Sequence, residues 1–234
     1  MRNIKKFTGK ENHFVTLAEI NEFTRNYRKT FGGDALPGGF FDKNAVRSLI
    51  EQKDAVGMRY YYGQDVAGQS VLILTGTTTD RQDLLDGEKV FVSTLNPAMS
   101  ADGVYRGEDA DHQIALQAAA QLTAEYRAKK SPDQPKGGFF GKAAIHAILN
   151  QENCIGLRFY FGANENGKRV LCLMGVDAVG KDMVNGILAE KSVWCPPWCG
   201  DFNRLNSDRF QHTDARGMAS TSFAIASLSE SEMN

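Results

Sequence analysis

Hydrophobic residues recur at helical spacing near the start of the chain. Four of them lie three or four residues apart and would share one face of a helix: Leu17, Ile20, Phe23 and Tyr27. Thr16 and Glu19 form the sequence pattern of a capping box, so this helix is expected to begin directly after Thr16. A loop rich in glycine and proline then precedes a second helix, expected at about residues 42–52.

Further along, two β-prone runs at residues 56–62 and 70–76 flank a loop that contains glycine, which predicts a β-hairpin. Gly68, near the end of that loop, is expected to adopt a positive φ, which costs glycine no steric penalty. Residues 90–95 alternate well enough to predict a third, less regular strand. The pattern therefore predicts a unit of two helices, a hairpin and one further strand.

This pattern occurs twice, at a spacing of 99 residues. Without a gap, residues 17–101 and 116–200 share 25 identities in 85 pairs, which indicates gene duplication. The predicted fold class is α+β: a tandem duplication of a helix-helix-β-hairpin unit, related by a pseudo-two-fold axis, with an antiparallel sheet that carries helices on one face. We expect repeats at residues 14–101 and 113–200. Residues 201–234 have no counterpart and are expected to form a C-terminal arm, docked on the surface or partly mobile.

A Gly-Gly-Phe-Phe segment precedes the second helix in each repeat. Glycines there can present N–H groups to an anion, but phosphate loops follow a strand and have the spacing GxxxxGK[ST] or GxGxxG, and neither spacing occurs in this sequence. We therefore expect the glycines to form a turn and the phenylalanines to fill the core between the second helix and the sheet.

One face of the first hairpin strand keeps an arginine and a tyrosine in both repeats, whereas the other face varies among apolar residues. The pairs are either the solvated face of a one-sided sheet or a surface that binds an anion or a partner, because Arg offers a planar fork for carboxylate or phosphate. The ligand-binding candidates, including a lysine in the first turn of each second helix, are Arg59, Tyr61, Lys43, Arg158, Tyr160 and Lys142.

Two cysteines, Cys195 and Cys199, bracket a pair of prolines, and the first repeat lacks them. Three states stay open: reduced structural thiols, a local disulfide, or half of a metal site. A cytosolic setting favours reduced thiols, and the spacing matches no standard four-ligand zinc pattern. We expect a structural thiol loop without metal, with Trp194 and Trp198 packed against the second repeat or forming an apolar contact surface.

Composition narrows the function classes. The chain has 27 basic and 28 acidic residues, which argues against a nucleic-acid surface. We see no secretory signal or membrane span, so a cytoplasmic location without a membrane partner is expected. Common enzyme motifs are absent from the sequence, and we expect no cofactor. The histidines are scattered without helical pairing: His13, His112, His146 and His212.

Residues 153–162, residues 175–182 and the segment Cys-Pro-Pro-Trp-Cys-Gly at residues 195–200 carry a resemblance. They resemble a family of uncharacterised bacterial proteins built on one such unit, which ends in Cys-Pro-Pro-aromatic-Cys-Gly. The resemblance covers most of the second repeat and, more weakly, the first, which lacks the cysteines. It implies a bacterial origin and a small α+β unit, and it carries over no catalytic residue.

Two function classes remain. The favoured one is a non-enzymatic binding or scaffold protein that recognises a partner protein or a small anionic ligand. The other is an enzyme of unrecognised type that uses the arginine–tyrosine face or the Cys195–Cys199 loop. A pocket that gathers Arg59 or Arg158 with a buried acid or histidine would favour the enzyme, and a flat exposed face would favour binding.

Overall fold

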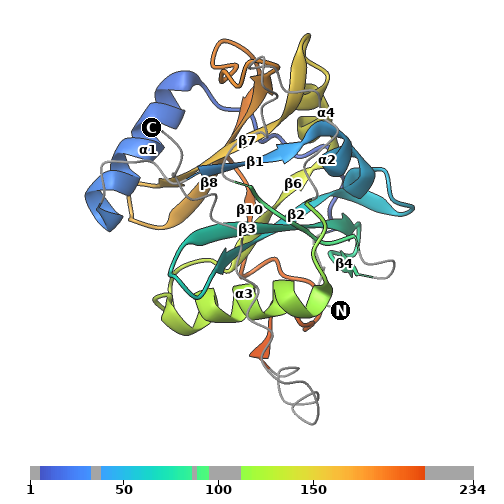
Figure 1. Ribbon diagram of the computed structural model, residues 1–234, viewed down its shortest axis with the longest axis vertical. Helices are drawn as coiled ribbons and strands as arrows, with labels where there is room; N and C mark the ends of the chain where they lie inside the picture. The colour runs from blue at the N-terminus through green and yellow to red at the C-terminus, as the bar shows by residue number, and fades with distance from the viewer. Residues whose placement is uncertain (1–5, 33–37, 86–88, 95–111, 209–234) are drawn as a thin grey trace, which may run out of the picture.

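Two antiparallel sheets pack against each other through their apolar faces (Figure 1). The computed structural model describes residues 6–32, 38–85, 89–94 and 112–208. The first sheet has the order β1 (Gly38–Asp42), β7 (Cys154–Ala163), β8 (Arg169–Asp177) and β9 (Leu188–Ala189). The second has the order β10 (Val193–Cys195), β6 (Gly137–Gly141), β2 (Ala55–Gln64), β3 (Ser70–Thr78) and β4 (Asp83–Leu84), and β5 (Phe91–Val92) also pairs with β3.

The two halves of the chain exchange a strand. β1, from the first half, pairs with β7 of the second half, and β6, from the second half, pairs with β2 of the first. In the first pairing Gly39 lies opposite Phe159, and in the second Gly138 lies opposite Tyr60, the equivalent positions 99 residues apart. Each half therefore completes the sheet of the other.

The glycines of the exchanged strands are needed because aromatic rings lie directly over them. A Cβ atom at Gly39 would lie 2.6 Å from the ring of Phe159, and one at Gly138 would lie 2.7 Å from the hydroxyl oxygen of Tyr60. The Gly-Gly-Phe-Phe segments are thus strands, and the prediction that their glycines form a turn is wrong. All four phenylalanines are fully inaccessible to solvent, but the prediction that they fill the core beside the second helix is confirmed only for Phe41 and Phe140. Phe40 packs with Val176 and Phe139 stacks on Phe7, away from that core.

The helices occupy both faces of the sheets. These helices are α1 (Leu17–Phe31), α2 (Lys43–Ile50), α3 (Leu116–Lys129) and α4 (Lys142–Leu149). The short helices α2 and α4 each contact both β2 and β7 and help to fill the core between the sheets. The longer helix α1, from the first half, packs on β7 and β8 of the second half, and α3, from the second half, packs on β2 and β3 of the first (Figure 1). These helices thus cross between the halves as β1 and β6 do.

Local signals in the sequence explain where several elements begin. The Thr16 side chain accepts a hydrogen bond from the Glu19 N–H while the Glu19 carboxylate accepts one from the Thr16 N–H, so the predicted capping box is confirmed. Both hairpins form as expected, and Gly68 and Gly167 have φ values of 86° and 70°. Of the predicted third strand, Phe91–Val92 forms β5.

The apolar face of the hairpin strands is buried between the sheets and against α2 and α4. Side chains from both halves meet there, among them Tyr62 and Phe161, whose ring centroids lie 5.7 Å apart. The prediction that helices cover only one face is wrong, because α3 packs residues such as Ala119 against Tyr61, and α1 packs residues such as Ile20 near Tyr160. The arginine–tyrosine face is therefore covered as well.

Candidate functional site

The arginine and tyrosine of β2 form a buried cluster with an aspartate from β4. Arg59 Nε donates to Asp83 Oδ1 at 2.9 Å, and the Tyr61 hydroxyl donates to Asp83 Oδ2 at 2.5 Å. Arg59 also donates to the carbonyl oxygens of Arg81 (3.0 Å) and Trp198 (3.1 Å). The side chains of Arg59 and Asp83 are fully inaccessible to solvent. We call Arg59, Tyr61 and Asp83 the first cluster.

The same arrangement recurs on β7 as a second cluster, made of Arg158, Tyr160 and Asp182. Arg158 Nε lies 3.2 Å from Asp182 Oδ1, and the Tyr160 hydroxyl donates to Asp182 Oδ2 at 2.6 Å. This cluster is less buried, because the side chain of Asp182 is 25% exposed whereas that of Asp83 is inaccessible. The aspartates were visible in the sequence as a matched pair, but their pairing with arginine was not.

The aspartates pair with the arginines, so each cluster contains an ion pair within the protein. Burial and the adjacent Asp83 raise the pKa of Tyr61 well above its ordinary value, and burial and Asp182 raise the pKa of Tyr160 to about 12, so both hydroxyls stay protonated. The interpretation of a solvated arginine–tyrosine face is wrong for Arg59, Tyr61 and Arg158, which are all buried.

The two candidate lysines lie away from these clusters. Lys43 is in the first turn of α2, and its ammonium group donates to the carbonyl oxygen of Cys154 at 3.0 Å. Lys142 is in the first turn of α4, close enough to His146 for its charge to lower the pKa of that histidine, after burial as the larger cause. Both lysines lie at the start of the helices that help to fill the core between the sheets, whereas the arginines lie on the opposite faces of β2 and β7, which α3 and α1 cover.

Cys195 and Cys199 are joined by a disulfide, with their Cα atoms 4.6 Å apart. The expectation of reduced structural thiols is therefore wrong for this structure; the disulfide alternative holds. The loop is closed further by a hydrogen bond from the Trp198 N–H to the Trp194 carbonyl oxygen at 3.0 Å. Cys195 is buried at the end of β10, whereas Pro196 and Pro197 are exposed and both follow cis peptide bonds.

The residues after the disulfide form a cap segment, residues 201–208, over the first cluster. Asn203 Nδ2 donates to Asp83 Oδ2 at 2.8 Å, and Leu205 is fully buried beside Tyr61. Lys136 and Arg127 donate to the carbonyl oxygens of Asn206 and Leu205 at 2.8 and 2.7 Å. This part of the predicted arm is docked, and residues 209–234 lie outside the described residues.

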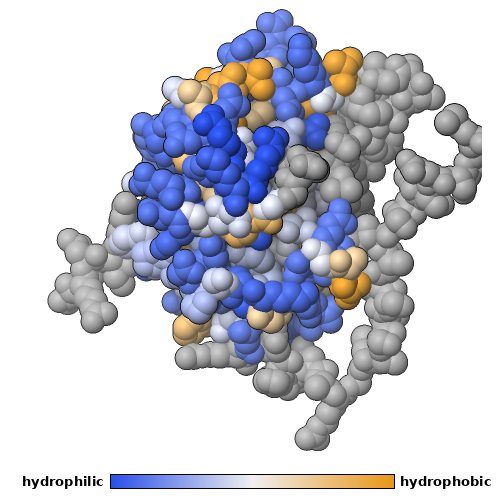
Figure 2. Space-filling model, turned by 90° about the vertical axis from the view of Figure 1, so that its left-hand side faces the viewer, coloured by the Kyte–Doolittle hydropathy of each residue, from blue (hydrophilic) through white to orange (hydrophobic). Residues whose placement is uncertain are grey.

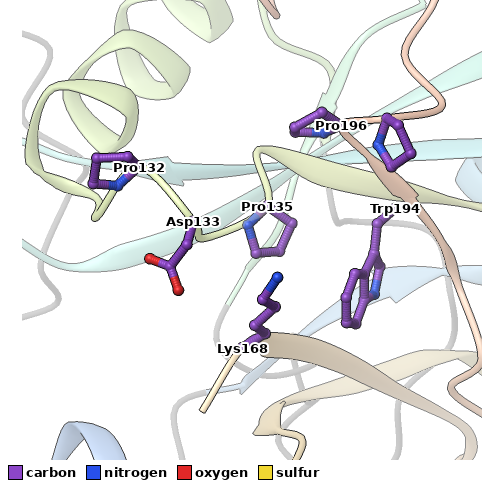
Figure 3. Close-up of a pocket in the computed structure, with 7 residues that line it drawn as sticks. Pro132, Asp133, Pro135, Lys168, Trp194 and Pro196 are labelled. Carbon is purple, nitrogen blue, oxygen red and sulfur yellow. The ribbon is translucent and has the colours of Figure 1, made fainter. Parts of the chain in front are cut away.

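Pro196 and Pro197 of the disulfide loop also line a hollow of about 250 Å³ (Figure 3). Asp133, Lys168 and Trp194 line it together with four prolines: Pro132, Pro135, Pro196 and Pro197. Lys168 reaches up between Pro135 and Trp194, and its ammonium nitrogen lies 5.8 Å from the centre of the indole ring. The walls are therefore mostly rigid rings, with one basic and one acidic side chain among them.

Hydrogen bonds tie the three walls of this hollow together. The side chain of Gln134 accepts from the Arg169 N–H at 2.9 Å and donates to the Gly167 carbonyl oxygen at 2.9 Å, which fixes the loop of residues 131–136 to the hairpin that carries Lys168. The Lys136 N–H donates to the Cys195 carbonyl oxygen at 2.7 Å, which fixes the same loop to the disulfide. The hollow is therefore a preformed feature.

Two buried histidines hold the exchanged strands, a role that the sequence analysis missed. His13 Nε2 accepts from the Gly141 N–H at 2.9 Å at the end of β6, and Nδ1 donates to the Lys191 carbonyl oxygen at 2.7 Å. His112 Nε2 accepts from the Asp42 N–H at 3.0 Å at the end of β1. The spacing of 99 residues between His13 and His112 was the available signal, although the sequence could not show their partners.

Comparison with protein-family models, with curated proteins and with solved structures finds no significant match. The family resemblance and the bacterial origin that it implies therefore stay predictions. Within the described ranges, no group of three or more His, Cys, Asp or Glu side chains is placed to hold a metal ion. None of the helices in those ranges has the length and apolar character needed to cross a membrane.

Arg59→Leu is expected to lower the free energy of unfolding by about 3–5 kcal/mol, because it leaves Asp83 buried without its ion partner. The matched change Arg158→Leu should cost less, since water can still reach the more exposed Asp182. Urea unfolding of both variants measures the two losses. Equal losses would show that burial does not set the strength of these ion pairs.

His13 should make the protein less stable in acid. Burial lowers its pKa below the usual 6.5, against the opposing effects of the Lys191 carbonyl group and Glu11. Its contribution is therefore present above pH 6.5 and is lost as the pH falls toward the folded-state pKa, because the unfolded chain then binds more protons. Stability curves from pH 7.5 to 5 should fall more steeply for the wild type than for His13→Gln.

The comparison with His13→Gln is needed because Glu190 acts in the opposite direction. Burial raises the pKa of Glu190 to about 7, so its effect on stability becomes more unfavourable as the pH rises from 4.5 through 7. This effect is common to both proteins and cancels in their difference. Parallel curves for the two proteins would contradict the role given to His13.

Proposed function

We propose that the protein is a non-enzymatic binding protein that holds a short segment of a partner protein in the hollow beside Trp194. The observation that carries this proposal is the preformed hollow itself, walled by an indole ring and four prolines and fixed on three sides by hydrogen bonds. Aromatic and proline rings form rigid apolar contact surfaces that lose little conformational entropy on binding.

The size of the hollow favours a side chain of a partner over a free small molecule. Pockets for small molecules and cofactors usually measure about 300–1,000 Å³ and enclose most of the ligand. This hollow measures about 250 Å³. It can take an apolar side chain, and the Lys168 ammonium group can at the same time bind a carboxylate or carbonyl oxygen of the same segment.

Within the described residues, the face of the molecule shown in Figure 2 carries no broad apolar surface. On the side of the molecule that carries α1, hydrophilic residues cover most of the surface and hydrophobic ones form small, separate groups (Figure 2). Specific recognition commonly relies on a few aromatic anchors rather than on broad area. Trp194 is such an anchor, because it is half-buried and one of only two tryptophans in the chain.

The arrangement of the two clusters argues against an enzyme that uses the arginine–tyrosine face. Arg59 does meet a buried acid, but the cap segment and α3 cover that cluster and the ion pair uses the carboxylate. A catalytic base or acid needs access to the substrate. An anionic ligand at these arginines is likewise disfavoured, because Asp83 and Asp182 already neutralise them.

Selection from a random-peptide display library tests the proposal without a guessed ligand. Peptides selected on the wild type should lose at least about 30-fold in affinity on Trp194→Ala, because removing an aromatic anchor typically costs about 2 kcal/mol or more. The matched control is Trp198→Ala, which removes the other tryptophan of the loop from outside the hollow. Failure to select peptides, or peptides that bind Trp194→Ala as tightly as wild type, would overturn it.

We further propose that the chain is an internal duplication whose halves are related by an approximate two-fold axis. Three observations support this: the exchanged strands use equivalent registers, the clusters on β2 and β7 have equivalent members, and His13 and His112 bind equivalent backbone groups. A duplicated unit of this kind would once have paired with a second copy of itself.

This proposal predicts that residues 109–234 alone form a homodimer, in which β6 of each copy pairs with β7 of the other. Light scattering should give twice the mass of the fragment. In such a dimer Gly138 would lie under Phe159, so Gly138→Val should block association. A folded monomer, or a fragment that stays unfolded at every concentration, would contradict the proposal.

A further inference from the structure

The disulfide loop contributes to two features of the structure. Its prolines form one wall of the hollow, and its Trp198 carbonyl oxygen accepts a hydrogen bond from Arg59 in the first cluster. The cap segment begins two residues after Cys199 and covers the same cluster. The disulfide therefore lies at the root of the cap segment.

We propose that the Cys195–Cys199 disulfide is a redox-sensitive clasp: closed, it keeps the cap segment docked over the first cluster, and opened by a dithiol, it lets the cap segment leave while the sheets stay folded. This device goes beyond peptide binding in the hollow, and its test uses no ligand of the hollow.

The chemistry needs only a dithiol reductant. One thiolate of the dithiol attacks a sulfur of the disulfide, the Cys195–Cys199 bond breaks, and a mixed disulfide forms. The second thiolate of the reductant then displaces the protein sulfur, so the reductant leaves as its own disulfide. Two electrons and two protons end on Cys195 and Cys199 as two thiols, and an oxidised dithiol reverses the reaction.

The cap segment is held in a way that allows it to leave independently. The cap segment forms no strand or α-helix. Side-chain hydrogen bonds, such as those from Asn203 to Asp83 and from Asn206 to the Tyr61 hydroxyl, hold it against the protein. Its single fully buried apolar side chain within the described residues is Leu205. Segments with few buried apolar contacts open locally at a lower free energy than the sheets.

The other two cysteines do not compete for the reductant or for alkylating reagents. Cys154 and Cys172 are buried, and burial raises the pKa of the Cys172 thiol well above its ordinary value, which keeps it protonated and unreactive. Thiol–disulfide exchange and alkylation are therefore expected at Cys195 and Cys199 rather than at Cys154 and Cys172.

The expected size of the effect follows from the size of the ring. A disulfide that closes a loop of five residues disfavours the open state by a factor of about 30, equivalent to about 2 kcal/mol. The cap segment continues directly from this loop, so reduction should raise the opening equilibrium of the loop, and of the cap segment that opens with it, by up to about 30-fold. Of the ring residues, only Cys195 belongs to a sheet, at the end of β10. The opening equilibrium of the sheets should therefore not change on reduction.

Amide hydrogen exchange on the full chain, with and without dithiothreitol, tests this. In the cap segment the N–H groups of Leu205, Asn206 and Ser207, which donate within the segment, should exchange faster after reduction, by up to about 30-fold, whereas those of β7 and β8 should keep their rates. Tryptophan fluorescence should change in parallel, because both tryptophans of the chain flank the loop.

The variant Cys195→Ser with Cys199→Ser is the matched control. It should exchange like the reduced wild type and should not respond to dithiothreitol, and reoxidation of the wild type should restore slow exchange. Unchanged exchange in the cap segment after reduction would overturn the proposal, and so would equal acceleration in β7 and β8, which would make the disulfide a general structural link. Cysteines that stay as free thiols after treatment with an oxidised dithiol would also overturn it.

Discussion

The exchange of β1 and β6 between the two halves is the constraint on which the rest of the structure depends. Each strand completes the sheet that the other half begins, so neither half closes a core by itself. The exchange requires glycine where Phe159 and Tyr60 lie over the strand, and it brings the buried histidines into position at the strand ends. The core between the sheets then consists of contacts between residues far apart in the sequence, such as Tyr62 with Phe161.

Burial of the first cluster explains why the cap segment lies where it does. A buried guanidinium is tolerated only when its donors are bonded, and Arg59 obtains its partners from β4, from the loop at Arg81 and from the disulfide loop. Asp83 in turn accepts from Tyr61 and from Asn203 of the cap segment. The ion pair thus links the sheet to the once-occurring loop and cap, and this link makes the docking of the cap sensitive to the state of the disulfide.

Local patterns in the sequence predicted the secondary-structure elements better than they predicted which distant residues pack against each element. The capping box at Thr16, the hairpins and the apolar strand face depend on neighbours within a few residues, and these predictions are confirmed. The glycines before the second helix were misread, because glycine pairs usually mark turns and only the ring of a distant residue makes them necessary in a strand. The hollow had no local signal, because its walls come from three segments between residues 132 and 197 that hydrogen bonds of Gln134 and Lys136 bring together.

The proposed binding site uses residues in which the two halves differ. Features that occur in both halves, such as the ion-pair clusters and the buried histidines at the ends of β1 and β6, contact the sheets in equivalent positions and so contribute to the architecture. The hollow and the clasp depend on residues found once: Lys168 corresponds to Gln69, Trp194 to Leu95, and the cysteines to Asn96 and Ser100. Stability alone does not require these replacements, since the other half lacks them. A surface that binds a partner needs to occur only once, and the residues that distinguish the second half gather at the hollow and its disulfide loop.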